Sequence, residues 1–123
     1  MTIRSEHEIW GWHYSADCRA GNNNVLSKDA ILEFGNALIQ KIDMEAYGEP
    51  QIVHFGKEDK TGLTYSQLIT TSNICGHFCD DSHDLYFDVF SCKPFDISVI
   101  EGLLVDRFGF ESIKSRYFVR GRL

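Results

Sequence analysis

Residues 84–92 read DLYFDVFSC, and every second side chain in this stretch falls into one of two sets. Side chains along an extended strand point to opposite faces in turn, so this stretch presents two faces. One face carries Leu85, Phe87, Val89 and Ser91, and the other carries Tyr86, Asp88, Phe90 and Cys92. Aromatic and β-branched residues favour strands. We therefore predict a strand here that lies inside a sheet.

One helix is predicted before this strand in the sequence, and another is predicted after it. Ser27 is a typical N-cap, and the apolar residues that follow it recur at three- and four-residue spacings: Ile31, Phe34, Leu38 and Ile42. Asp96 caps a second helix, which Gly109 ends, and its apolar stripe consists of Val99, Ile100, Leu103, Leu104 and Phe108. Each stripe is wide enough to cover one face of a sheet.

The remaining extended stretches are residues 8–16, 50–55, 63–78 and 112–121, separated by turn-rich segments such as GNNN and GKEDKTG. The predicted order is strand, helix, three strands, helix, strand. The economical arrangement is an α+β, two-layer sandwich, with two helices on one face of a mainly antiparallel sheet and one domain over residues 1–123. The other face needs cover, so we expect a second copy there or along an edge, as a homodimer.

Composition excludes several classes of function. Hydrophobic residues make up 43% and the net charge is −6, which indicates a folded chain and argues against nucleic acid as a partner. No segment has the pattern of a membrane span or a signal peptide, so we expect no membrane partner and a cytoplasmic location. The four cysteines are then expected to be reduced thiols.

The segment TTSNICGHF, residues 70–78, places polar and sulfur-bearing side chains inside a predicted strand. Cys75, His77 and Cys79 would share one face, where zinc could be bound with help from His83 or Cys92. Ligands two residues apart on a strand lie roughly 6 to 7 Å from each other, which is long for one tetrahedral site. We therefore predict no metal site, and the alternative is that these cysteines are small buried side chains.

Ser72, His77 and Cys92, with the stretch FDVFSCKPFD around the cysteine, resemble in type and spacing the prokaryotic S-adenosylmethionine decarboxylase family. The family pattern is Glu-Ser-His, three residues, His-Thr-Trp-Pro-Glu, and then a strand that ends in Asp-Val-Phe-x-Cys. GWHYSAD at residues 11–17 is similar to the family's opening strand, and RGR at 120–122 is similar to its closing motif. The resemblance covers nearly the whole chain.

The resemblance implies a lyase whose cofactor, a pyruvoyl group, is made from Ser72 after autocatalytic cleavage between Thr71 and Ser72. His77 would assist the proton transfers of self-cleavage, and Cys92 would protonate the substrate carbon after carbon dioxide leaves. Asp81 and Phe55 would contact the substrate, S-adenosylmethionine, whose decarboxylated form serves spermidine biosynthesis. A pyruvoyl ketone condenses with a substrate amine and withdraws the electrons that decarboxylation releases.

Three departures from the family pattern keep other functions open. Thr71 replaces glutamate before the cut, Asn73 replaces histidine after it, and Cys79-Asp80-Asp81 replaces Trp-Pro-Glu. One alternative is a decarboxylase of another amino acid, ornithine or arginine. A second is an unprocessed, non-catalytic relative that binds a nucleoside ligand or a homologous partner, and a zinc-binding module is the last.

Overall fold

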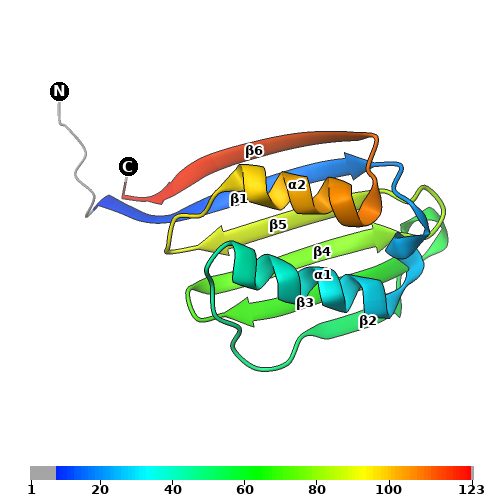
Figure 1. Cartoon of the computed structure of the whole chain (residues 1–123), viewed down its shortest axis with the longest axis horizontal. Coiled ribbons are helices and arrows are strands. Elements are labelled where there is room, and N and C mark those ends of the chain that lie inside the picture. Colours follow the sequence, from blue (N-terminus) through cyan, green and yellow to red (C-terminus); the bar gives the residue numbers. More distant parts are fainter. Residues whose placement is uncertain (1–7, 123) are drawn as a thin grey trace.

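The computed structural model describes residues 8–122. Its elements along the chain are β1 (Ile9–Arg19), η2 (Asn23–Leu26), α1 (Lys28–Lys41), β2 (Gln51–Phe55), η3 (Glu58–Lys60), β3 (Gly62–Ile69), β4 (Ser72–Cys79), β5 (Leu85–Ser91), α2 (Ile97–Phe108) and β6 (Ser112–Gly121). Six strands form one sheet in the order β2-β3-β4-β5-β1-β6, and every neighbouring pair is antiparallel (Figure 1).

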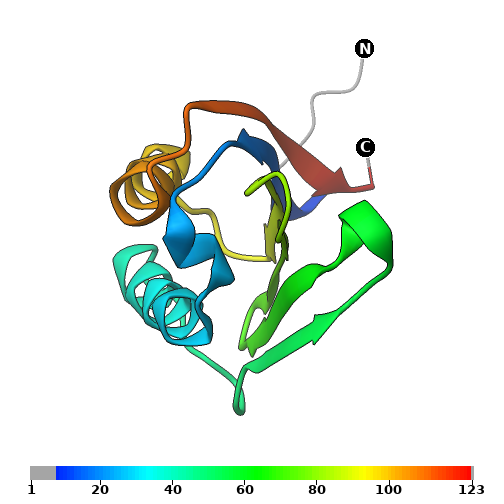
Figure 2. The same cartoon turned by 90° about the vertical axis from the view of Figure 1, so that its right-hand side faces the viewer.

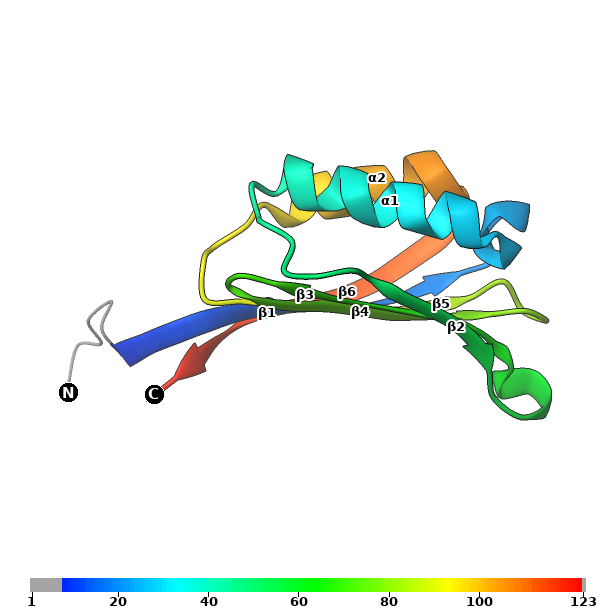
Figure 3. The same ribbon diagram turned by 90° about the horizontal axis from the view of Figure 1, so that it is seen from below.

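Both helices lie on the same face of the sheet, which makes the molecule a two-layer sandwich. The end-on view shows α1 and α2 side by side opposite the sheet (Figure 2), and the edge-on view shows both helices on one side of it (Figure 3). The predicted fold class, an α+β sandwich with an antiparallel sheet, is confirmed. Below, the face of the sheet away from α1 and α2 is called the open face.

The helix ends form where the sequence predicts them. The Ser27 hydroxyl accepts the Ala30 N–H at the start of α1, and the Asp96 carboxylate accepts the Ser98 N–H at the start of α2. Gly109 ends α2 with a φ of 60°, a left-handed conformation that glycine adopts without steric cost. These local signals mark the start of each helix and the end of α2.

Aromatic side chains dominate the core between the helices and the sheet. The ring of Phe34 on α1 packs edge-on against Phe87 of β5 and Phe108 of α2, with centroids 5.7 and 5.1 Å apart. Phe78 of β4 also contacts Phe108. All four of these rings are buried. The alternation predicted for DLYFDVFSC therefore exists, with Leu85, Phe87, Val89 and Ser91 on the buried face.

The prediction of one extended run over residues 63–78 is wrong. The chain turns at Thr70 and Thr71, so the run forms the antiparallel hairpin of β3 and β4, in which Ile69 pairs with Ser72. Four strands rather than three thus separate the helices. Threonine has high strand propensity, and this turn lacks the glycine or asparagine that usually marks a two-residue hairpin.

The open face has no helix over it within residues 8–122. Its exposed side chains include several large apolar ones, such as Val53, Phe55, Leu68, Tyr86 and Phe118. No helix in the described part of the chain is both long enough and apolar enough to cross a bilayer. The open face is therefore an apolar surface that the fold leaves available to a partner.

Candidate functional site

The β3–β4 turn carries the predicted cleavage point, and neighbouring loops hold it in place. The Thr70 N–H donates to the Glu45 carbonyl at 2.8 Å, in the segment that follows α1. Neither Thr70 nor Thr71 has a positive φ. The turn is therefore held by hydrogen bonds and contains no residue with a left-handed φ.

The Thr71 carbonyl group receives a hydrogen bond from the residue predicted to be catalytic. The Cys92 N–H donates to the Thr71 carbonyl oxygen at 3.0 Å, and Ser72 lies directly opposite Ser91 in the pairing of β4 with β5. The fold thus brings Thr71, Ser72, Ser91 and Cys92 together, although they are as much as 21 positions apart in the sequence. We call these four residues the hairpin-end cluster.

The segment after α1 closes one side of this cluster. The Thr71 hydroxyl donates to the Met44 sulfur at 3.3 Å, and Lys93, the residue after Cys92, forms an ion pair of 2.7 Å with Asp43. The Lys93 hydrogen bond and charge lower the pKa of the Asp43 carboxyl group. Asp43 itself has a φ of 58°, and Lys93 also donates to its carbonyl oxygen. These contacts anchor the segment beside Thr71.

Two cavities flank the hairpin-end cluster. One, of about 490 Å³, is lined by Ile9, Trp12, Cys92 and Pro94. The other, of about 250 Å³, is more polar and is lined by Asp43, Met44, Glu45, Thr70, Thr71 and Lys93. Cys92 is exposed, so its thiol is accessible from the first cavity. The second cavity therefore reaches Thr71 itself, and the first reaches Cys92, whose N–H binds the Thr71 carbonyl group.

His77 lies on the open face of β4, in a second group of predicted site residues. Its Nε2 lies 2.6 Å from the Lys60 carbonyl oxygen and its Nδ1 lies 2.5 Å from the Thr64 hydroxyl. A carbonyl only accepts, so Nε2 carries the proton and Nδ1 accepts from Thr64. The exposed ring of Phe55 lies 6.1 Å from the imidazole, centroid to centroid. We call Phe55, Thr64 and His77 the open-face cluster.

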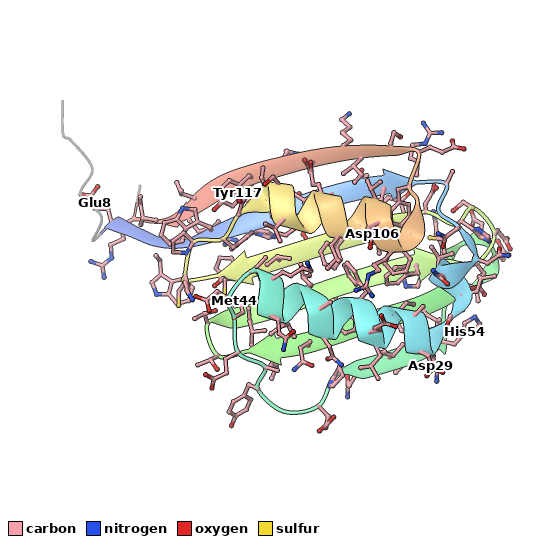
Figure 4. All side chains as sticks on the ribbon, viewed as in Figure 1. Glu8, Asp29, Met44, His54, Asp106 and Tyr117 are labelled. Atoms are coloured by element: carbon pink, nitrogen blue, oxygen red, sulfur yellow. The ribbon has the colours of Figure 1, made fainter. Side chains whose placement is uncertain are left out.

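The two clusters do not meet within one chain. Ser72 and His77 are five residues apart on β4, which is about 17 Å along a strand and places them on opposite faces. Asp81 lies exposed in the turn after β4. The preceding residue, Asp80, forms a hydrogen bond of 2.7 Å between its carboxylate and the His54 Nε2. Figure 4 labels Met44, beside Thr71, and His54, beside Asp80, at opposite ends of the sheet. Asp81 is therefore also remote from Ser72 of its own chain.

The remaining cysteines have the character of packing residues. Burial raises the pKa of the Cys18 thiol to about 12, and burial also raises the pKa values of Cys75 and Cys79. Within residues 8–122 no three His, Cys, Asp or Glu side chains lie where they could jointly hold a metal ion. The side chains weighed for zinc thus form no ligand cluster in the described part of the chain.

Three residues at these clusters were missed by sequence reasoning. Ser91 follows the alternation of a buried strand, so nothing in its neighbourhood marks it as special. Thr64 becomes a partner of His77 only through the pairing of β3 with β4, which a misplaced turn conceals. Met44 comes from an irregular segment. Recognising the turn at Thr70–Thr71 would have revealed Thr64, because antiparallel register follows from the turn.

Comparison with known proteins identifies the family. The family model described as S-adenosylmethionine decarboxylase matches residues 12–121. The chain is also similar to the crystal structure of the adenosylmethionine decarboxylase from Aquifex aeolicus VF5, with a TM-score of 0.78 and 17% sequence identity over 94% of each chain. A search of curated protein sequences finds no match. The match to the family model covers most of the chain, and the chain therefore belongs to the S-adenosylmethionine decarboxylase family.

Proposed function

We propose that the chain is a pyruvoyl-dependent decarboxylase that generates its cofactor from Ser72 and acts on S-adenosylmethionine, for spermidine biosynthesis. The observation that carries the proposal is the hydrogen bond from the Cys92 N–H to the Thr71 carbonyl oxygen, 3.0 Å long. This oxygen would gain negative charge when Ser72 attacks the Thr71 carbonyl carbon. A fixed N–H donor at that oxygen stabilises such an oxyanion.

Self-cleavage requires two steps at this peptide, formation of an ester and then an elimination. First, the Ser72 Oγ bonds to the Thr71 carbonyl carbon, the C–N bond breaks, and the hydroxyl proton passes to the nitrogen, which gives an ester. Second, a base removes the Ser72 Cα proton and the Cβ–O bond breaks, which releases the Thr71 carboxylate. Addition of water to the resulting enamine and loss of ammonia leave a pyruvoyl group on residue 72.

The residues present fit that group. Ser72 is half-buried beside Cys92, which lines the 490 Å³ cavity. The pyruvoyl ketone would supply an electron sink for decarboxylation of an amino acid bound through its amine. Cys92 would hold the proton that the substrate carbon takes up, because its thiol is exposed toward that cavity.

The lining of the larger cavity supports S-adenosylmethionine. Trp12 presents an aromatic side chain, and an indole attracts a sulfonium cation or stacks on a base. The four described residues that line this cavity are all uncharged. The side-chain ammonium of ornithine or the guanidinium group of arginine would therefore have no carboxylate partner among these four residues.

A second candidate, decarboxylation of ornithine or arginine, is favoured by the other cavity. Asp43 and Glu45 line it next to Thr71, and a carboxylate there suits a distal cation. Asp43 is already paired with Lys93, which leaves Glu45 as the acceptor for such a group. We rank this candidate below S-adenosylmethionine for that reason.

We also propose that the active form contains a second copy of the chain. His77 would assist the proton transfers of cleavage, yet it lies about 17 Å from Ser72 on the opposite face of β4. A second copy packed on the open face would cover Phe55, Leu68 and Tyr86, which are each at least half exposed. In a two-fold dimer the open-face cluster of one protomer would complete the hairpin-end cluster of its partner, with Phe55 and Asp81 as substrate contacts from the partner.

The test is release of carbon dioxide from carboxyl-labelled S-adenosylmethionine, ornithine and arginine by purified protein. We expect release from S-adenosylmethionine, complete loss in Ser72→Ala, and full activity in Ser112→Ala, which changes an exposed serine at the start of β6. Release from ornithine or arginine alone would establish the second candidate. An intact chain with no release from any substrate would support the unprocessed, non-catalytic relative.

A further inference from the structure

Ser91 forms a continuous chain of hydrogen bonds at the end of β5. Its side chain is fully buried, and its hydroxyl donates to the Thr71 hydroxyl at 2.7 Å. It accepts the Lys93 N–H at 3.0 Å, while the Thr71 hydroxyl donates onward to the Met44 sulfur at 3.3 Å. The Ser91 hydroxyl also lies 3.6 Å from the Met44 sulfur, but its shorter hydrogen bond is the one to the Thr71 hydroxyl.

This series of hydrogen bonds holds the Thr71 side chain from the end of β5, and the same end of β5 also holds the Thr71 carbonyl group. Ser91 binds the Thr71 side chain, and the next residue, Cys92, donates its N–H to the Thr71 carbonyl oxygen at 3.0 Å. Two hydrogen bonds, from the consecutive residues Ser91 and Cys92, thus hold the side chain and the carbonyl group of Thr71. Rotation of the Thr71 carbonyl away from the Cys92 N–H would therefore break or strain the bond to Ser91 as well.

We infer that Ser91 is a positioning residue for self-cleavage, which aligns the Thr71 carbonyl with the Cys92 N–H before Ser72 attacks. This inference rests on the proposed function. The step that it assists is the first one, in which the Ser72 Oγ–C bond forms, the Thr71 C–N bond breaks and the proton moves from oxygen to nitrogen. Ser91 exchanges no proton with the reacting atoms and acts only through Thr71.

The experiment follows cleavage of freshly synthesised chain by gel and intact mass, with and without hydroxylamine, which cuts the ester as soon as it forms. We expect Ser91→Ala to cleave about tenfold more slowly, the rate equivalent of one oriented hydrogen bond. The same factor is expected with hydroxylamine, because the lost contact acts before the ester. Ser91→Thr should restore the rate to within about threefold of the unchanged chain, since it keeps the hydroxyl.

A parallel pair of variants tests the other end of the same bond. Thr71→Val keeps the shape and loses the hydroxyl, so it should slow cleavage like Ser91→Ala, whereas Thr71→Ser should not. Rates are divided by the folded fraction from circular dichroism, and Ser112→Ala is the control. A normalised Ser91→Ala rate equal to that of the unchanged chain would overturn this inference alone. An unchanged chain that never cleaves would overturn the proposed function and the role of Ser91 with it.

Discussion

Complementation between two inactive chains tests whether His77 acts on the Ser72 of a partner. The two changes are Ser72→Ala, which removes the nucleophile, and His77→Ala, which removes the imidazole. His77 lies five residues further along β4, about 17 Å from Ser72 and on the opposite face. Alone, His77→Ala should cleave roughly a hundredfold more slowly or worse, as expected for loss of a general acid–base group. Alone, Ser72→Ala has no nucleophile and should stay intact.

Equal co-expression of the two chains should restore cleavage in a defined amount. If copies pair at random in a two-fold dimer, about half of the dimers are mixed, and each mixed dimer has one complete site. That site joins the Ser72 of the His77→Ala chain with the His77 of the Ser72→Ala chain. About half of all His77→Ala chains should therefore be cut at the rate of the unchanged protein.

Chains of different tag length separate the products on a gel, so the cut chain is identified directly. The matched control pairs His77→Ala with a Ser72→Ala/His77→Ala chain, which offers the same surface without an imidazole. Cleavage of the His77→Ala chain that does not rise above this control would refute the proposal that the partner supplies His77. Normal cleavage of His77→Ala by itself would refute any role of His77.

Further expectations concern stability and the roles of single groups. Tyr65→Phe should raise the free energy of unfolding by about 1 kcal/mol, because the Tyr65 hydroxyl is the buried side-chain polar atom that lacks a hydrogen-bond partner in the described chain; a lower midpoint in urea would contradict this. Burial raises the pKa of Cys18 from 9.0 to about 12 and that of Tyr65 from 10.0 to about 12, so the folded state holds these protons more tightly than the unfolded state. The contribution of these two groups to stability is therefore fully present below pH 9 and is lost as pH rises from 9 to 12. Cys18→Ala should flatten this fall in unfolding curves, and an unaltered slope would count against it. Cys92→Ala should still be cleaved, because its main-chain N–H remains, yet it should lose roughly a hundredfold in decarboxylation; equal loss of both activities would argue against separate roles for the N–H and the thiol.

Local signals in the sequence predicted much of the fold. The caps at Ser27 and Asp96 and the alternation over residues 84–92 are all present in the structure, because each depends on neighbours a few residues away. The turn at Thr70–Thr71 was missed because threonine favours strand by propensity. Two tertiary hydrogen bonds hold the turn instead: the Thr70 N–H donates to the Glu45 carbonyl, and the Cys92 N–H donates to the Thr71 carbonyl. Contacts with residues distant in the sequence therefore override the local preference for strand at Thr70–Thr71.

The candidate site was predictable only in its residue types. The resemblance singled out Ser72, His77 and Cys92, and the fold brings Cys92 to the Thr71–Ser72 peptide through the pairing of β4 with β5. His77 was expected to share a strand face with Cys75 and Cys79, and in β4 it lies with them on the face away from Ser72. Ser91 had no signal, since a serine on a buried face is informative only once its partners are known.

Every role proposed above depends on cleavage between Thr71 and Ser72, which the denatured intact mass of freshly purified protein measures. We expect two fragments, residues 1–71 and residues 72–123, the second starting with a pyruvoyl group in place of serine. A single species of 14.1 kDa that persists on incubation would contradict it.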